Sequence, residues 1–456
     1  MTWRQGLPVL VVQAETLGAI GVIRSLGRAG YPVHACATEP SALGLASRFA
    51  STRTVCPRYE DPAFLPWLHR YLASNGIRAI VPSESFLLAV RPAFSELARL
   101  LPCPPRQETA YAGMSKLDLF EALVSQGAPH LPPTLVVDPI ERLPSPLLLQ
   151  ALGPPLYVKA DAAHARTSAP SVVLRAATAW DARALLDRLA ATYRGALVQG
   201  HVPGRGVGAF VLISRAGEVL AEFMHRRLHE VPHTGGASSH RESWLHLGIL
   251  GDALDKVRAV QWQGVAMMEY RLDRKTGDYR FLEMNGRFWG SLHLALAAGV
   301  DFPRLLIDDF FGWPVEPVRS WRLGVKSRHT FPAEVEHVWT KLKDPALRPL
   351  ARAWPIAEFA LLGADPRVRS DLSFPGDGGL YWRQLASWAR TAARQVFGRL
   401  RAAWGRVDGD GDGGGSQAAE EVGAAGEPER GAVRPGAPPD AGPAAHPLLP
   451  RDGDAG

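Results

Sequence analysis

Two glutamates, Glu269 and Glu283, each stand in a short run of alternating apolar residues, the pattern of a β-strand buried on one face. A polar segment around Thr276 separates the runs, so the sequence predicts a hairpin. With the turn centred on Thr276, Glu269 lies opposite Glu283, and Asn285 follows two residues further along the same face. Opposed carboxylates repel unless a cation lies between them, and their hard oxygen ligands favour Mg²⁺. A one-residue shift of the strands would instead leave both carboxylates in solvent.

Two lysines stand where a lone cation is unfavourable. Lys116 follows Ser115, which is expected to cap a helix, so its charge opposes the helix dipole unless a phosphate compensates both. Lys159 lies in the apolar run 156–160, which is typical of a strand, and its ammonium could reach a phosphate. For both residues the alternative is an ordinary lysine that extends into solvent.

Glycines and arginines mark two further candidate segments. Residues 201–208 contain three glycines, a pattern typical of a hinge or of backbone that approaches a flat ligand, and equally of ordinary turns. Arg226 and Arg227 precede a loop, 232–239, that is rich in glycine and small hydroxyl residues. Their guanidinium groups and the NH groups of the loop could bind an anion, although a mobile, solvated loop fits the same pattern.

The elements that must position these residues begin with a β-α-β unit over residues 7–37. The turn at 14–18 lacks the GxGxxG pattern, so the unit does not by itself indicate a dinucleotide. A later strand, 78–82, ends at Ser83 and Glu84, and ligand residues often follow such strands. Capping of the next helix explains Ser83 equally well.

Composition limits the function classes. The chain has 456 residues, 46% of them hydrophobic, and no run of about 18 apolar residues that would predict a membrane span. Its three cysteines are too few and too widely spaced for a disulfide framework or a zinc site, and its start does not resemble a signal peptide. We therefore expect a cytoplasmic protein.

The net charge of +6 is unevenly distributed. Residues 405–456 contain ten acidic residues and four arginines, so the rest of the chain has 47 basic and 35 acidic residues, a net charge of +12. A basic folded part suits an anionic ligand such as a nucleotide. Residues 405–456 are rich in Ala, Gly and Pro, which predicts a disordered tail.

Residues 381–404 form an amphipathic pattern with arginines on the face opposite the apolar residues. Docking of this helix on the folded body is the expected arrangement. Association with an anionic membrane surface is the alternative, without stable insertion into the membrane.

The run from Phe281 to Ser291, FLEMNGRFWGS, together with Glu269 and the two lysines, resembles the ATP-grasp superfamily. It is most similar to the carboxylate–amine ligase branch, as are the segments HRRLHEVPHTGGASSHRES and AxxxGVDFP. The resemblance covers roughly residues 7–315. It implies an α/β fold class, α+β in the central part: an N-terminal Rossmann-like domain followed by an ATP-grasp fold of two α+β subdomains that clasp ATP.

The resemblance and the composition of the C-terminal part together give expected domain boundaries for the whole chain. They are 1–110 for the Rossmann-like domain, 111–198 for the small ATP-grasp subdomain, 199–318 for the subdomain with the metal site, 319–404 for a C-terminal helical extension and 405–456 for the tail.

The resemblance also implies roles for individual residues. Lys116 and Lys159 would contact the phosphates of ATP, and the hinge Gln199, Gly200, His201 and Val202 would contact the adenine. Glu269, Glu283 and Asn285 would hold Mg²⁺, and Arg287 would steady an acyl phosphate and its transition state. Further substrate contacts are expected from Ser83, Glu84, Arg226, Arg227 and Ser291.

Three positions depart from the pattern of the superfamily. The loop after the second lysine is usually glycine-rich, but residues 160–170 contain no glycine. The hinge commonly carries a glutamate after its glutamine, where this chain has Gly200. The usual Asn-Pro-Arg is Asn285-Gly286-Arg287, which keeps both functional side chains.

These observations predict an ATP-dependent ligase that joins a small-molecule carboxylate to an amine, releasing ADP and phosphate, without a nucleic-acid partner. A phosphotransferase that releases a phosphorylated product is one alternative. A nucleotide-binding regulatory module without turnover is another, because the loop lacks glycine and Gly200 replaces the glutamate. The sequence does not identify the acid, the amine or the oligomeric state.

Overall fold

The computed structural model describes residues 2–167 and 169–407. Its chain divides into two compact units, Met1–Gln395 and Val396–Gly456, and every element discussed below in the context of the site belongs to the first. No helix of the described residues is both long enough and apolar enough to span a membrane. The predicted disordered tail lies outside the described residues from position 408 onward.

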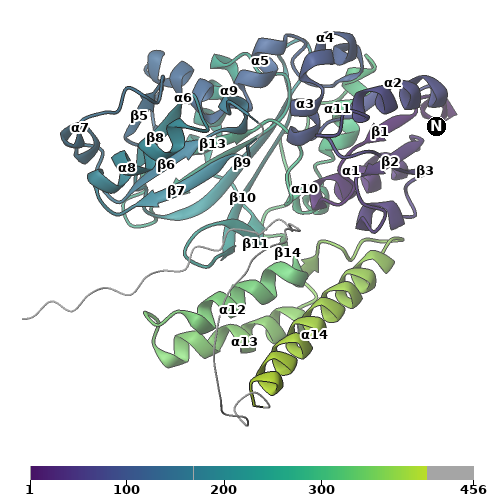
Figure 1. Ribbon diagram of the computed structural model, residues 1–456. Coiled ribbons are helices and arrows are strands. Elements are labelled where there is room, and N and C mark those ends of the chain that lie inside the picture. Colours follow the sequence, from purple (N-terminus) through teal and green to yellow (C-terminus); the bar gives the residue numbers. More distant parts are fainter. Residues whose placement is uncertain (1, 168, 408–456) are drawn as a thin grey trace, which may run out of the picture. The chain divides into compact units, whose positions relative to one another are not determined.

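An N-terminal parallel sheet, with strand order β3-β2-β1-β4, confirms the predicted β-α-β unit (Figure 1). Its central strands are runs of β-branched and small apolar residues that are buried on both faces, as expected for a parallel sheet. The elements are β1 (Val9–Val11), α1 (Leu17–Arg28), β2 (Val33–Ala37), β3 (Thr52–Val55), α2 (Phe64–Asn75), β4 (Ala79–Val81), α3 (Glu84–Ala89), α4 (Phe94–Leu97) and α5 (Gln107–Ala112).

A second, antiparallel sheet has the order β5-β8-β6-β7 and packs against helices α7 and α8 (Figure 1). The capping box at Thr178 and Asp181 starts α8, and the apolar side of that helix closes the core of this sheet. The elements are α6 (Lys116–Ser125), β5 (Thr134–Val137), α7 (Pro146–Gln150), β6 (Leu156–Ala160), β7 (Val172–Ala176), α8 (Ala179–Ala190) and β8 (Ala196–Gly200).

The third sheet has seven strands in the order β13-β12-β9-β10-β11-β14-β15. Its apolar residues share one core with the N-terminal sheet, so the two sheets are packed together rather than joined by a linker. The elements are β9 (Arg205–Ile213), β10 (Val219–Val231), β11 (Ala237–Ser243), α9 (Leu247–Ala259), β12 (Gly264–Leu272), β13 (Tyr279–Asn285), α10 (Leu292–Ala298) and α11 (Phe302–Phe310).

The C-terminal segment is not purely helical, because two of its short strands, β14 and β15, extend the seven-stranded sheet beyond β11. A single π turn, η6, leads into the helices. The elements are β14 (Lys326–Arg328), η6 (Thr330–Glu334), α12 (Val335–Lys343), α13 (Pro349–Ala364), β15 (Val368–Ser370) and α14 (Gly379–Val407), of which the last was expected over 381–404.

A buried arginine attaches this C-terminal segment to the N-terminal domain. Arg24 on α1 is fully buried, and its Nε donates to Asp377 at 2.9 Å. Its two other nitrogens donate to the carbonyl oxygens of Asp371 and Leu372, each at 2.9 Å. Because every donor of a buried guanidinium needs a partner, the segment around 371–377 is held firmly against α1.

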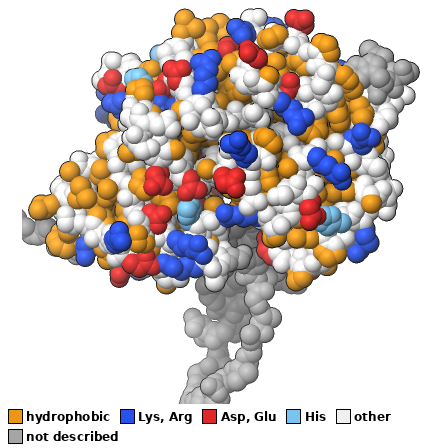
Figure 2. All heavy atoms as spheres, turned by 90° about the horizontal axis from the view of Figure 1, so that it is seen from above, with side chains coloured by type: hydrophobic (Ala, Val, Ile, Leu, Met, Phe, Trp, Pro, Cys, Tyr) orange, Lys and Arg blue, Asp and Glu red, His pale blue; other side chains and the backbone are white. Residues whose placement is uncertain are grey.

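The excess positive charge outside the tail does not gather over the top of the molecule. Basic and acidic side chains are scattered among apolar ones on the face shown in Figure 2. This face therefore offers no concentrated basic patch to an anion.

Candidate active site

The predicted hairpin pairing is confirmed. Strands β12 and β13 are antiparallel, with Glu269 opposite Glu283 and Met267 opposite Asn285. One feature differs from the expectation: a bulge follows Glu269, so that Tyr270 pairs with Phe281 and the register beyond it is shifted by one residue.

The bulge leaves Leu282 without a partner residue on β12. Leu282 and its neighbour Glu283 consequently line the same cavity, where strict alternation would have sent them to opposite faces. The hairpin thus supplies an apolar wall and a carboxylate side by side, which the sequence pattern did not predict.

The two paired glutamates are largely buried, and each contacts a different cation. Lys116 Nζ lies 3.1 Å from one carboxylate oxygen of Glu283, and Asn285 Nδ2 donates to the other at 3.1 Å. Arg227 Nη2 lies 2.5 Å from Glu269 Oε2. Each of the two carboxylates is therefore paired with its own cation.

This arrangement separates the acidities of the two glutamates. Burial raises the pKa of Glu283, but the charges of Lys116 and Lys159 outweigh it and hold the pKa at about 2. Burial raises the pKa of Glu269, with Arg227 opposing that rise and the charge of Glu283 adding to it. Glu283 therefore stays ionised at neutral pH. An added cation would stabilise the ionised form of Glu269 more than that of Glu283.

The two lysines reach the site from different elements. Lys116 is the first residue of α6, whose predicted cap is confirmed because Ser115 Oγ accepts from Asp118 N at 3.1 Å. Lys159 lies on β6, as expected, and burial together with the charge of Lys116 lowers its pKa to about 8. Two cations so close together favour a ligand with several negative charges.

A narrower cavity of about 340 Å³ lies at the end of β8. The four hinge residues Gln199, Gly200, His201 and Val202 line it together with Val173 and Leu282, which form apolar walls. Gln199 is buried, and its Nε2 donates to Thr134 Oγ1 at 3.1 Å. Among the described residues, its Oε1 has no hydrogen-bond partner, so it is an acceptor available to a ligand.

The structure explains the glycine in the hinge. A Cβ atom at position 200 would lie 2.1 Å from the carbonyl oxygen of Leu152, which leaves no space for any side chain. Gly200 N also donates to Pro133 O at 2.9 Å, which fixes this strand end. The glutamate that is common in the superfamily is therefore excluded here by packing.

The two neighbouring arginines point to opposite sides of the sheet. Arg227 is buried in the central cavity, where it contacts Glu269 and donates to Gly236 O at 2.7 Å. Arg226 donates from Nε to Glu242 at 2.8 Å and lines none of the three cavities described here. The structure does not bring Arg226 together with the other candidate residues.

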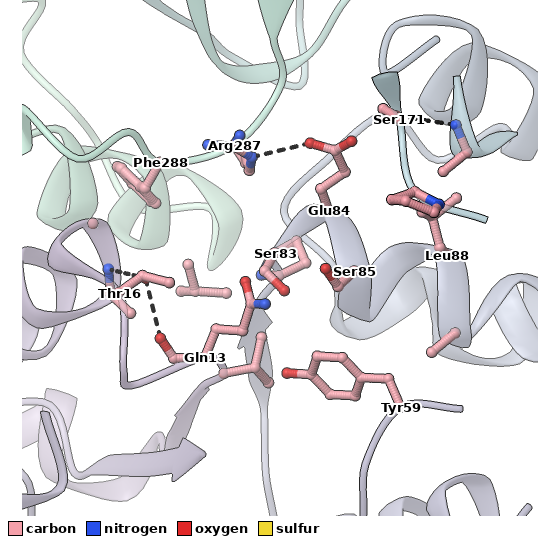
Figure 3. Close-up of a pocket in the computed structure, with 18 of the residues that line it drawn as sticks. Gln13, Thr16, Tyr59, Ser83, Glu84, Ser85, Leu88, Ser171, Arg287 and Phe288 are labelled. Carbon is pink, nitrogen blue, oxygen red and sulfur yellow. Dashed lines mark hydrogen bonds and ion pairs between the residues drawn. The ribbon is translucent and has the colours of Figure 1, made fainter. Parts of the chain in front are cut away.

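A larger cavity, of about 1000 Å³, lies between the N-terminal sheet and the hairpin (Figure 3). The predicted residues Ser83, Glu84 and Arg287 all line it. Ser83 Oγ caps α3 by accepting from Phe86 N at 3.2 Å, so its capping role is real. Glu84 Oε2 lies 3.3 Å from Arg287 Nε, an ion pair that joins α3 to the segment after β13.

Other residues of this cavity were not predicted. Gln13 and Thr16, at the end of β1, lie on the same side of the cavity as Ser83 (Figure 3). Gln13 has a positive φ of 53°, which is unusual for a residue with a side chain and is often found at functional sites. Their position after the first parallel strand was the signal that could have found them. Arg91 also lines the cavity.

The central cavity, about 610 Å³, adjoins the other two. It shares Lys159 and Arg271 with the narrow cavity and Arg287 with the large one, and Ser291 lies in its wall. A ligand can therefore extend from the hinge, past the glutamate pair, to Arg287.

Two side chains of the loop without glycine attach it to helix α6. Asp161 accepts from Leu117 N at 3.0 Å, and His164 Nε2 lies 2.8 Å from Asp118 on the same helix, α6. The hydrogen bond that His164 donates to the Asp118 carboxylate raises the pKa of His164. Residues on both sides of the loop, including Ala163 and Ser171, line the large cavity, so the loop forms a wall there although it lacks glycine.

Comparisons with solved structures identify the fold. A crystal structure of L-amino acid ligase from Bacillus licheniformis matches with a TM-score of 0.51 and 15% sequence identity, covering 68% of this chain and 75% of that chain. N5-carboxyaminoimidazole synthetase from Staphylococcus aureus, complexed with ADP, matches with a TM-score of 0.54 and 14% identity over 71% of this chain and 81% of that chain.

The biotin carboxylase domain of 2-oxoglutarate carboxylase from Hydrogenobacter thermophilus, crystallised with MgADP, ADP and bicarbonate, matches with a TM-score of 0.55 and 15% identity over 70% of this chain and 73% of that chain. No family model matches the sequence, and a comparison with curated proteins finds no match. The chain has the ATP-grasp fold, as the sequence predicted, with an N-terminal α/β domain in front of it.

Proposed function

We propose that this protein is an ATP-dependent ligase that activates a carboxylate as an acyl phosphate and couples it to an amine. The observation that carries the proposal is the buried Glu269–Glu283 pair with Lys116 and Lys159 beside it. This arrangement suits a polyphosphate accompanied by divalent cations better than it suits any neutral ligand.

The residues of the hairpin fit Mg²⁺. Glu269, Glu283 and Asn285 supply only oxygen ligands, from one face of two paired strands, and Glu269 is destabilised as an anion by its neighbour. Held by these three residues, Mg²⁺ would supply positive charge that stabilises phosphoryl transfer.

ATP, as a substrate, fits the narrow and central cavities together. Apolar walls at Val173 and Leu282 suit a flat base, and Gln199 Oε1 can accept from an exocyclic amine. Lys116 and Lys159 then contact the phosphates. Because burial lowers the pKa of Lys159 to about 8, an arriving phosphate also stabilises the charged form of this ammonium group.

The carboxylate substrate belongs in the large cavity, next to Arg287. In the structure Arg287 is paired with Glu84, and a substrate carboxylate can take over one side of this guanidinium. One substrate oxygen attacks the γ-phosphorus, the bond to the ADP oxygen breaks, and ADP leaves. The amine then attacks the carbonyl carbon, phosphate leaves, and the nitrogen loses a proton.

A substrate screen tests this function. The protein is incubated with MgATP and pools of carboxylic acids and amines, while ADP release and product masses are recorded. We expect ADP and phosphate in equal amounts with a new amide in the pool that turns over. A phosphorylated acid or alcohol that accumulates without an amide would instead identify a phosphotransferase.

Two variants make the screen specific. Glu283→Gln should abolish turnover in the active pool, because it removes one metal ligand and the partner of Lys116. Glu218→Gln, at an exposed turn, is the matched control and should behave as the parent. Equal ADP release by Glu283→Gln and the parent would contradict the role given to the hairpin.

A further inference from the structure

A cluster of three side chains near the end of β10 has the composition of a metal site. His229 on β10, His240 on β11 and Glu334 on η6 place one ligand atom each within 4.8 Å of one another. None of the three lines the cavities described above. The cluster is therefore separate from the proposed Mg²⁺ site.

Two members of this cluster are deeply buried. His240 is 4% exposed and Glu334 1% exposed. Within the described residues, neither ring nitrogen of His240 has a hydrogen-bond partner. A buried imidazole without partners is costly, and a ligand between it and Glu334 would remove that cost.

The geometry around His229 matches that of a metal-bound imidazole. Its Nδ1 lies 3.1 Å from Glu334 Oε2, close to the separation of about 3.3 Å between two ligands bound tetrahedrally at about 2.0 Å. Its other nitrogen, Nε2, lies 3.3 Å from Glu358 Oε1. A carboxylate that accepts from the second ring nitrogen of a ligating histidine commonly orients the ring. His337 also stacks on the ring of His229, with 4.3 Å between the ring centroids.

We propose that His229, His240 and Glu334 bind a divalent transition metal, Zn²⁺ in the first instance. Two imidazoles and one carboxylate are a common ligand set for this ion. The ligands come from two strands and from the turn that begins the C-terminal helices. A bound ion therefore ties those helices to the β10–β11 hairpin, which carries Arg227.

The test uses the full chain, stripped with a chelator and then dialysed against trace Zn²⁺ in excess Mg²⁺. We expect about one tightly bound Zn²⁺ per chain and a raised melting temperature. His240→Gln should bind Zn²⁺ at least about tenfold more weakly than the parent. His233→Gln, which removes a nearby histidine paired with Asp344, is the matched control and should keep it.

Two results would overturn the proposal. If the stripped parent takes up no Zn²⁺, the cluster is an ion pair between His229 and its two glutamates only. If His240→Gln retains the zinc while Glu269→Gln loses it, the ion occupies the glutamate pair instead. Neither result depends on any substrate, so the outcome is distinct from that of the ligase proposal.

A second and independent observation concerns helix α13. Every exposed residue of this helix is apolar, and its two charged residues, Arg352 and Glu358, are only partly exposed. Arg352 donates to Leu342 O, and Glu358 contacts His229, so both point toward the protein. A surface helix without an exposed charge is exceptional for a protein surface that faces only water. The exposed residues include Leu350, Trp354, Ile356 and Leu361.

The segments that flank α13 in the chain have a strongly basic surface. Residues 335–394 have seven exposed basic side chains and one exposed acidic one, Glu336. The seven are Lys343, Arg348, Arg367, Arg369, Arg383, Arg390 and Arg394. Two more tryptophans, Trp339 and Trp382, are 50% and 67% exposed, and Lys343 lies over the ring of Trp339 at 4.4 Å.

We infer that α13 and its basic neighbours dock on the surface of an anionic lipid bilayer. Apolar residues on a helix, tryptophans and an excess of Lys and Arg are together the features of an interfacial membrane contact. A second copy of the chain would bring like charges together, which disfavours a dimer at this face. The alternative of surface association, raised for residues 381–404 alone, is thus extended to the surface that contains α13.

Co-sedimentation with vesicles tests this surface. The full chain should bind phosphatidylcholine vesicles that contain phosphatidylglycerol, bind pure phosphatidylcholine vesicles much more weakly, and be released by salt. Trp354→Ser and Arg348→Glu should each weaken binding about tenfold or more. Trp180→Ser, on the distant helix α8 where the tryptophan is 71% exposed, is the matched control and should bind as the parent.

Equal binding to neutral and anionic vesicles, or none to either, would overturn this inference. So would a dimer in solution that Trp354→Ser dissociates, because the apolar face would then be covered by a second copy.

Discussion

Glu269 and Glu283 face each other across β12 and β13, but each forms its ion pair with a different element, Glu269 with Arg227 on β10 and Glu283 with Lys116 on α6. The like charges are thus held together by cations from two sides. The two ion pairs involve separate elements, α6 and β10. A divalent cation bound by both carboxylates would therefore affect both ion pairs at once.

The first prediction concerns Mg²⁺. Glu269→Gln removes the carboxylate whose pKa is raised by burial and by Glu283. Because this carboxylate is a proposed Mg²⁺ ligand, the Mg²⁺ concentration needed for half-maximal ADP formation should rise by about 10–100-fold. Titration of Mg²⁺ at fixed ATP measures it. Glu242→Gln, which loses the partner of Arg226 on the other side of the sheet, serves as the control, and an equal rise in both variants would contradict the assignment.

A second prediction follows from the pKa of Lys159. Burial lowers it to about 8, so the ammonium is charged below that pH and neutral above it. ATP affinity in the absence of turnover should therefore fall as the pH rises through about 8. Lys159→Arg stays charged throughout, and its affinity should be nearly independent of pH over the same range. Parallel pH profiles for the two proteins would show that another group titrates.

Gly200 gives a third prediction. Gly200→Ala places a Cβ atom 2.1 Å from Leu152 O and should reduce the free energy of unfolding by about 1–3 kcal/mol. Urea denaturation measures the change. Gly251→Ala, in helix α9 with no atom near the new Cβ, should instead be neutral or stabilising by up to about 1 kcal/mol.

The fourth prediction concerns the buried Arg24–Asp377 pair. Arg24→Met leaves the Asp377 carboxylate buried without its partner and should cost about 3–5 kcal/mol of stability. Arg58→Met breaks the exposed pair with Glu39 and should cost less than about 1 kcal/mol. If the two variants unfold at the same urea concentration, Arg24 does not hold the C-terminal segment as described.

The sequence predicts the hairpin well because a period of two residues and a polar turn determine which side chains face each other. It could not predict the bulge at Leu282, since one extra residue in a strand leaves no mark on composition. Alternation also could not show which of Arg226 and Arg227 faces the cavity. Two consecutive strand residues always point to opposite faces, and the start of β10 determines which of them points to the cavity.

Local sequence patterns could not predict contacts between segments that are distant in the chain. The pair Arg24–Asp377 and the pair Arg287–Glu84 join elements that only the tertiary fold brings together. Strands β14 and β15 have three residues each, too short for periodicity to indicate them. The cavity residue Gln13 was missed because a search for GxGxxG considers only glycines at that strand end.

The most direct test of the ligase proposal follows an oxygen atom. Once a substrate acid is found, it is labelled with ¹⁸O in its carboxylate and turned over with ATP and the amine, and the released phosphate is analysed by mass spectrometry. Activation through an acyl phosphate predicts that each phosphate carries one oxygen from the acid. Phosphate without the label, formed together with the amide, would contradict the central claim.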